Sequence, residues 1–325
     1  MIPFDDNPPD PEEQLLPQQD SLLPSAPEAP RVEASTPEPL AVEASAPLAG
    51  DPISYAAAAV PPSYSPARRR ALPEDLRISW SWPHFCVFIF YALASFFLVQ
   101  TALIFYYAPH RGLPPKELER YLLNKPQFLF GTNLLWYAAI FLFLYVTLGV
   151  LRDKPFWPSL GWKKLKANLA TGKANPWAYF FAGCGLAIFV FVVSSRVHTD
   201  DKIPIQEVLK NRNSAMLLMA MAVLVAPLVE ETVFRGYLYP LFAKSFGILP
   251  GILLTGVLFG LMHGSQLGWT WGIVGLLILV GIIFTFARAQ TGTVLASFLL
   301  HLGYNSMIAV ATIIGTHGFN QIPTH

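Results

Sequence analysis

The chain has 325 residues, of which 53% are hydrophobic and only 13% are charged, whereas about 25% of residues are charged in a typical soluble domain. This composition excludes an ordinary water-soluble globule. Residues 1–82 carry five Lys/Arg and 13 Asp/Glu and residues 83–325 carry 17 and eight, but neither part has the clustered basic face of a nucleic-acid-binding protein, so we expect no nucleic-acid partner.

Residues 1–76 are predicted to form a disordered cytoplasmic tail. The first 75 residues hold 16 of the 29 prolines and repeat a loose pattern of Ala, Pro, Glu and Ser. A segment with so little apolar surface cannot offset the conformational entropy that it would lose on ordering. We read this tail as a solvated linker and assign it no chemistry.

The rest of the chain, residues 77–325, is predicted to be a transmembrane domain. Seven apolar stretches are long enough to cross a hydrocarbon core, and several are flanked by Trp or Tyr, as is typical of membrane interfaces. They cover residues 83–108, 128–151, 177–197, 214–243, 247–264, 267–287 and 293–315. We therefore predict an all-α, multi-pass bundle of about seven to eight transmembrane helices in contact with membrane lipid.

Positive charge predicts the orientation of this bundle. With the N-terminus inside, the inner side carries 12 Lys/Arg when only the four at 68–77 are counted in the tail, and the outer side carries eight when Arg196 at the end of the third stretch is included. Because Lys and Arg are enriched on the cytoplasmic side of membrane proteins, we expect an integral membrane protein with a cytoplasmic N-terminus.

Polar side chains interrupt three of the apolar stretches. A charged side chain in the middle of a spanning helix costs at least about 2.5 kcal/mol on insertion scales, so such a residue is a candidate for function. The candidates are Glu230, Glu231 and Arg235 in the fourth stretch, His263 in the fifth, and His301 and Asn305 in the seventh.

Helix geometry predicts that these groups meet. If the fourth and fifth stretches form an antiparallel hairpin, Glu230 and His263 lie within about one helical turn of the same depth, and His301 reaches a similar level. Glu231 and Arg235 are four residues apart and can neutralise each other, which leaves Glu230 facing elsewhere.

Two mechanisms suit this set of groups. A carboxylate beside an imidazole can deprotonate a water, while a second imidazole and a carboxamide can donate hydrogen bonds to a developing oxyanion. Alternatively, Glu230, His263 and His301 could bind zinc and leave a position open for water. The chain has neither the HExxH pattern of helical zinc proteases nor the GxSxG pattern of serine hydrolases.

Three short motifs resemble those of a known family. EETVFR (230–235), FGLMH (259–263) and HLGYN (301–305) are similar to the EExxxR, FxxxH and HxxxN motifs of the CAAX prenyl endopeptidase and bacteriocin-processing (CPBP) family of intramembrane proteases. The resemblance covers a core of about residues 214–315. It implies an intramembrane endopeptidase that acts on a membrane-associated or lipidated protein or peptide.

The same resemblance implies a role for each motif residue. Glu230 and His263 would activate the water, His301 and Asn305 would form the oxyanion site, and Glu231 with Arg235 would support them. We favour the mechanism without a cofactor and keep zinc as the alternative. Members of this family act on several kinds of cargo, so a prenylated substrate is not assumed.

Two other functions would use the same residues. A buried hydrogen-bond network of this kind could hold together a non-catalytic membrane scaffold or a bacteriocin-immunity protein. Buried Glu and His also build the proton relays of transporters. We rank the endopeptidase first because residues from three separate stretches reach a similar depth.

Overall fold

The computed structural model describes residues 73–107, 112–123, 125–167, 174–197 and 211–319. Within these ranges the chain forms helices joined by turns, and no strand occurs there. Six described helical runs are long and apolar enough to cross a membrane, which confirms the predicted all-α membrane fold. Residues 1–72, which make up most of the predicted tail, lie outside the described residues.

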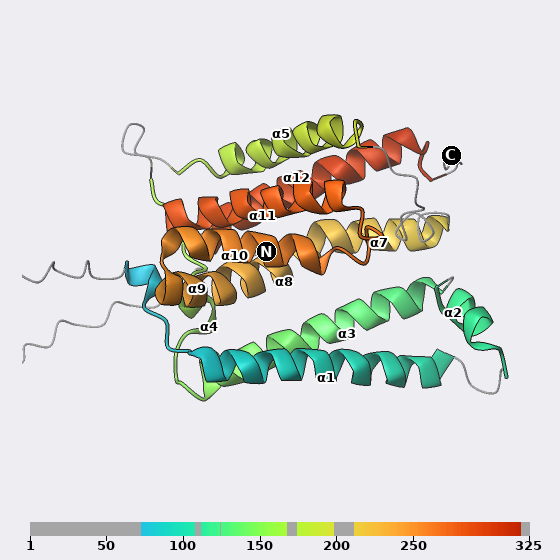
Figure 1. Cartoon of the computed structure of the whole chain (residues 1–325), viewed down its shortest axis with the longest axis horizontal. Coiled ribbons are helices and arrows are strands. Elements are labelled where there is room, and N and C mark those ends of the chain that lie inside the picture. Colours follow the sequence, from blue (N-terminus) through green and yellow to red (C-terminus); the bar gives the residue numbers. More distant parts are fainter. Residues whose placement is uncertain (1–72, 108–111, 124, 168–173, 198–210, 320–325) are drawn as a thin grey trace, which may run out of the picture. The chain divides into compact units, whose positions relative to one another are not determined.

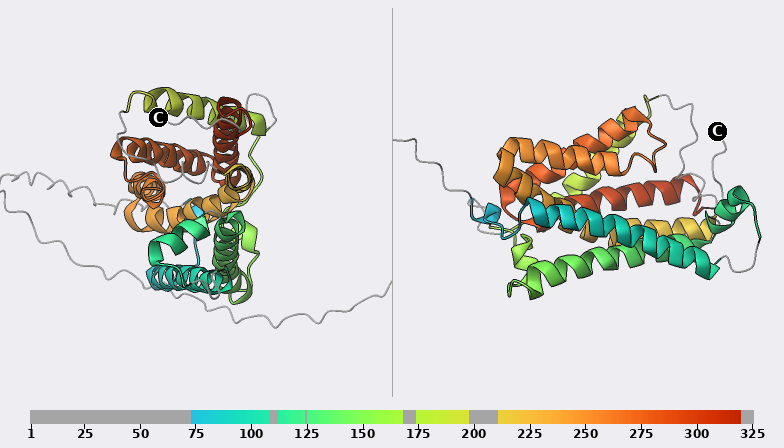
Figure 2. Two further views of the ribbon diagram at one scale, coloured as in Figure 1. Left: turned by 90° about the vertical axis from the view of Figure 1, so that its right-hand side faces the viewer. Right: turned by 60° about the horizontal axis from the view of Figure 1, so that its bottom comes forward.

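The long helices lie side by side and alternate in direction along the chain (Figure 1). Helices α5 and α12 pack together at one side of the bundle and α1 and α3 at the other, with α7 to α11 between them (Figure 2). The long helices are α1 (Trp82–Tyr107), α3 (Pro126–Leu144), α5 (Pro176–Ser194), α7 (Arg212–Leu224), α10 (Ile248–Met262), α11 (Trp271–Thr291) and α12 (Val294–Gly315). Shorter elements are η1 (Glu74–Leu76), α2 (Pro115–Leu123), η2 (Tyr145–Val150) and α4 (Phe156–Ser159).

The fourth predicted stretch is a helical run in four pieces. After α7 come α8 (Ala226–Glu231), the π-helical turn η3 (Thr232–Leu238) and α9 (Tyr239–Phe246). Pro227 lies in the first turn of α8. A backbone N–H in the first turn has no partner within the helix, so its absence in proline costs no hydrogen bond. A π-turn accommodates one extra residue and is frequent at functional sites. The regular α-helix is therefore interrupted on both sides of the two acids, at Val225 and in η3.

The fifth predicted stretch, 247–264, is too short to count as a full span. Helix α10 has 15 residues, and a helix of that length is about 22 Å long against a hydrocarbon core of about 30 Å. The helix ends at Met262 because the chain turns over residues 263–269, where Trp269 has a φ of 55°. Hydropathy places this end within two residues, since only Leu267 and Trp269 of the turn have large apolar side chains. The stretch is predicted to span because its 18 residues are close to the length that a crossing helix needs.

Glycines allow the closest helix contacts, as small residues do in other membrane bundles. A Cβ at Gly183 of α5 would collide with the backbone carbonyl of Leu300, and one at Gly303 of α12 would collide with that of Phe180. Gly256 and Gly260 of α10 meet the α11 backbone in the same way. These contacts hold α12 and α11, and the side chains that they carry, at fixed positions.

We expect Gly183→Ala to lower the free energy of unfolding by about 1–3 kcal/mol, the usual cost of overpacking. Gly185→Ala on the same helix is the matched control, because a Cβ there meets nothing within 4 Å. Since Ala is the better helix former by about 0.5–1 kcal/mol, the control should be neutral or slightly more stable. Thermal unfolding in detergent measures both, and equal unfolding temperatures would contradict the packing role.

Residues 74–80, at the junction of the predicted tail and the transmembrane domain, pack against the helices. Residues 74–76 form η1, and Leu76 and Trp80 are buried against the helices. Trp80 Nε1 donates to the backbone carbonyl of Tyr237 at 3.1 Å, and Asp75 pairs with the buried Arg288 at 2.7 Å. The described helical domain thus includes residues ahead of the first apolar stretch, because an aromatic ring and an ion pair fix them to η3 and α11.

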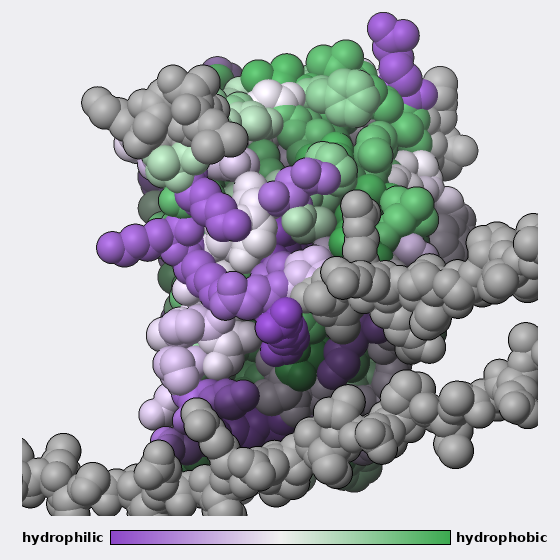
Figure 3. Space-filling model, turned by 90° about the vertical axis from the view of Figure 1, so that its left-hand side faces the viewer, coloured by the Kyte–Doolittle hydropathy of each residue, from purple (hydrophilic) through white to green (hydrophobic). Residues whose placement is uncertain are grey.

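Hydrophilic side chains gather at the end of the bundle where η1, α4 and α9 lie (Figure 3). Lys154, Lys163, Lys164 and Lys244 are exposed in the loops and helix end on this side. An end of this kind suits the headgroup region of a membrane rather than its hydrocarbon core.

Candidate active site

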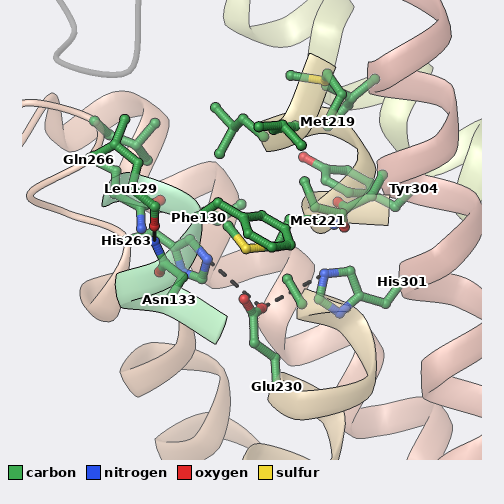
Figure 4. Close-up of a pocket in the computed structure, with 18 of the residues that line it drawn as sticks. Leu129, Phe130, Asn133, Met219, Met221, Glu230, His263, Gln266, His301 and Tyr304 are labelled. Carbon is green, nitrogen blue, oxygen red and sulfur yellow. Dashed lines mark hydrogen bonds and ion pairs between the residues drawn. The ribbon is translucent and has the colours of Figure 1, made fainter. Parts of the chain in front are cut away.

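Three of the predicted side chains converge in the middle of the bundle. Oε2 of Glu230 lies 3.9 Å from Nε2 of His263 and 3.8 Å from Nε2 of His301. The acid comes from α8, His263 caps the end of α10, and His301 lies in α12. Figure 4 shows Glu230 pointing toward both rings. The expectation that three separate stretches bring these groups together is confirmed.

The three side chains line one cavity of about 1070 Å³. Apolar residues from several helices make most of its wall, among them Phe130, Met219 and Met221 (Figure 4). Asn305 also lines it. The cavity is therefore large enough to hold several residues of an extended peptide, and its wall favours apolar side chains or lipid.

Glu231 and Arg235 form the predicted ion pair behind this cavity. Nη1 of Arg235 lies 2.8 Å from Oε1 of Glu231, and both side chains are completely buried. Arg235 also donates to the Gly281 carbonyl at 2.8 Å and to the Thr285 hydroxyl at 3.2 Å, and it lies 4.5 Å from the centre of the Phe259 ring. The pair thus ties η3 to α10 and α11. Neither residue is among those that line the cavity.

Hydrogen bonds on the far side of each ring orient the two histidines. Nδ1 of His301 donates to Oε1 of Glu231 at 2.9 Å, and Nδ1 of His263 donates to the Phe259 carbonyl at 2.8 Å. Both acceptors are oxygens without a proton to give, so each Nδ1 carries the hydrogen. The Nε2 atoms of both rings are left facing Glu230.

The gaps between Glu230 and the two rings suit a bridging water. Separations of 3.8 and 3.9 Å are too long for a direct hydrogen bond. A polar contact beyond about 3.5 Å is commonly bridged by water. The carboxylate and the imidazoles can therefore share one water molecule inside the cavity.

Asn305 is held by one hydrogen bond that the sequence does not predict. Its Nδ2 donates to the Ala222 carbonyl of α7 at 2.7 Å. A carboxamide nitrogen carries two hydrogens, so one N–H remains for another acceptor. The side chain is thereby kept at the cavity wall, one helical turn from His301.

Sequence reasoning missed the contribution of α3 to the cavity. Asn133 and Tyr137 of this helix line it together with Glu230, and Asn133 is labelled in Figure 4. Two polar residues four apart in an apolar helix are a weak signal by themselves, because the sequence does not say which helix they face.

The zinc alternative names Glu230, His263 and His301 as ligands. Two ligands of a tetrahedral zinc lie about 3.3 Å apart when each bond is about 2.0 Å long, which is shorter than the 3.8 and 3.9 Å found here. In the described part of the chain, no group of three or more His, Cys, Asp or Glu side chains is arranged to hold a metal ion. We therefore assign no step to a metal.

We expect Glu231→Gln to destabilise the fold, because it leaves the Arg235 charge buried without its partner. Removing one member of a buried pair typically costs about 3–5 kcal/mol. Thermal unfolding in detergent measures the loss, with Glu117→Gln on the exposed face of α2 as the control. A Glu231→Gln protein as stable as the control would contradict the structural role of the pair.

Comparison with known families agrees with this site. Residues 212–307 match the family model described as Type II CAAX prenyl endopeptidase Rce1-like, which confirms the resemblance stated from the three motifs. All six predicted site residues fall inside the match, whereas α1, α3 and α5 lie outside it. Neither a curated protein nor a solved structure gives a significant match. The family match implies a protease-type enzyme embedded in the membrane.

Proposed function

We propose that this protein is an intramembrane endopeptidase that hydrolyses a peptide bond in a membrane-associated or lipidated protein. One observation carries the proposal: Oε2 of Glu230 lies 3.9 and 3.8 Å from the Nε2 atoms of two histidines in a cavity of about 1070 Å³. The family match of residues 212–307 supports the choice of a peptide bond.

Glu230 acts as the general base in this proposal. A water held between its carboxylate and Nε2 of His263 gives a proton to Glu230, and the water oxygen attacks the carbonyl carbon of the peptide. The carbonyl oxygen becomes an oxyanion. It accepts a hydrogen bond from the remaining N–H of Asn305 and from Nε2 of His301 when that atom carries a proton.

Collapse of this intermediate completes the hydrolysis. The carbon–nitrogen bond breaks, and the proton that Glu230 took from the water passes to the leaving nitrogen. The products are a new C-terminal carboxylate and a free amine, and Glu230 is again a carboxylate. Glu231 and Arg235 take no part in these transfers. They act as positioning residues, because Glu231 holds His301 by its Nδ1.

The cavity wall supports an apolar substrate segment. Its lining is mostly apolar and it lies within a bundle whose long helices expose apolar side chains. A substrate that is already in the membrane, or is attached to it by a lipid, reaches such a site without leaving the bilayer. We also place the N-terminus in the cytoplasm, on the side of the exposed lysines, following the positive-inside rule.

We expect Glu230→Gln and His263→Ala to abolish cleavage while the protein still folds. Gln cannot take the proton from the water, and Ala removes the second partner of that water. The measurement uses the purified full chain in liposomes with two internally quenched peptides, one farnesylated on a cysteine near its C-terminus and one not. Profiling of C-terminal peptides in cells with and without Glu230 identifies natural substrates.

Glu117→Gln is the control for this assay, because it removes an exposed carboxylate that does not line the cavity. Full activity of Glu230→Gln would overturn the proposed mechanism. If the wild type cuts neither peptide and no cellular peptide depends on Glu230, the protein is better described as a scaffold. In that case the Glu230 and His263 substitutions would lower only the stability of the protein.

We expect chelators to leave activity within about twofold of the untreated enzyme, since the mechanism uses a carboxylate and no metal. The test incubates the protein with EDTA or phenanthroline before the peptide assay and then adds back zinc. Loss of activity that zinc restores would establish a metalloprotease, because a bound catalytic metal is removed by chelation and reloaded from solution.

A further inference from the structure

Helix α3 forms a continuous wall of the cavity. Pro126, Phe130, Asn133 and Tyr137 all line it, and their spacing of four, seven and eleven residues from the first places them on one face of a helix. The stripe is about 16 Å long at the rise of an α-helix. Because α3 lies outside residues 212–307, this wall is supplied by a part of the chain that the family match does not cover.

The rotation of α3 is fixed by its contacts with α1. Nε1 of Trp136 donates to the Ala92 carbonyl at 2.8 Å, and its ring packs on Phe96 with the centroids 5.3 Å apart. Ile140, one turn further on, is buried. Since Trp136 is bound to α1, Asn133 and Tyr137 are held toward the cavity that they line.

Tyr137 has an unused hydrogen-bond donor in this wall. Nδ2 of Asn133 donates to the Leu129 carbonyl of its own helix at 2.9 Å. For the Tyr137 hydroxyl, no hydrogen-bond partner is found among the described residues. Tyr137 and Glu230 line the same cavity. A phenol is both a donor and an acceptor, so this hydroxyl is available to a bound peptide.

In the proposed reaction, the motif residues leave few hydrogen-bond donors free to bind the oxyanion. Nδ1 of His301 is bound by Glu231, Nδ1 of His263 is bound by a carbonyl, and one N–H of Asn305 is bound by Ala222. Nε2 of His301 donates only when the ring is positively charged. An oxyanion is best stabilised by two or more donors already in place, and the motif residues leave only one N–H that is always present.

We propose that Tyr137 contacts the substrate and, together with Asn305, donates a hydrogen bond to the oxygen of the scissile carbonyl. This inference rests on the proposed function. It makes α3 a part of the active site, and it assigns a specific chemical role to a residue outside the three motifs. The hydrogen bond from the Tyr137 hydroxyl becomes stronger as negative charge develops on the carbonyl oxygen, so its loss should lower kcat rather than raise KM.

The test is Tyr137→Phe in the full chain in liposomes, with the peptide that the wild type cleaves. Removing one oxyanion donor typically lowers kcat by about 10²–10³-fold, and we expect a loss of this size with KM changed by less than about twofold. A peptidyl aldehyde of the same sequence, whose hydrate imitates the tetrahedral intermediate, should bind more weakly by a similar factor. The matching peptidyl alcohol should bind equally well to both proteins.

Tyr91→Phe is the matched control, because Tyr91 of α1 packs on Phe143 with the ring centroids 4.8 Å apart and does not line the cavity. Thermal unfolding establishes that both variants are folded. Wild-type kcat in Tyr137→Phe, or a rise in KM alone, would overturn the role of Tyr137 while leaving that of Glu230 intact. Absence of any cleavage by the wild type would overturn both proposals.

Discussion

The buried pair of Glu231 and Arg235 is the interaction on which the rest of the site depends. A lone carboxylate at this depth would be too costly to keep ionised, but Arg235 lies 2.8 Å away and neutralises it. The guanidinium also binds the Gly281 carbonyl of α11. Because the same Glu231 oxygen holds Nδ1 of His301, a single carboxylate links the fold of three helices to the orientation of the His301 ring.

Backbone contacts make this arrangement rigid. Gly183 and Gly303 let α5 and α12 touch, and Gly256 and Gly260 do the same for α10 and α11. Side chains at these positions would push the helices apart, and the distances from Glu230 to the two histidines would grow. Catalysis by preorganised groups tolerates little displacement, so the small residues serve the chemistry as well as the packing.

Much of the fold and part of the site could be predicted from the sequence. Hydropathy located the long helices, since an apolar run of about 20 residues matches the thickness of the hydrocarbon core, and the four-residue spacing identified Glu231 and Arg235 as a pair. The contacts of Asp75 and Trp80 were not predicted, because they join residues far apart in the chain. The same is true of Asn305 with Ala222 and of α3 with the cavity, since periodicity gives the face of a helix but not its neighbour.

The short length of α10 has a consequence for the surrounding bilayer. Its 15 residues fall about 8 Å short of the hydrocarbon thickness, and the deficit lies at the end that carries His263 and Gln266. The bilayer beside a short helix thins to match it, and the headgroups then lie closer to the end of that helix. A local depression of the membrane surface would thus bring water toward Glu230 and His263 without a dedicated channel.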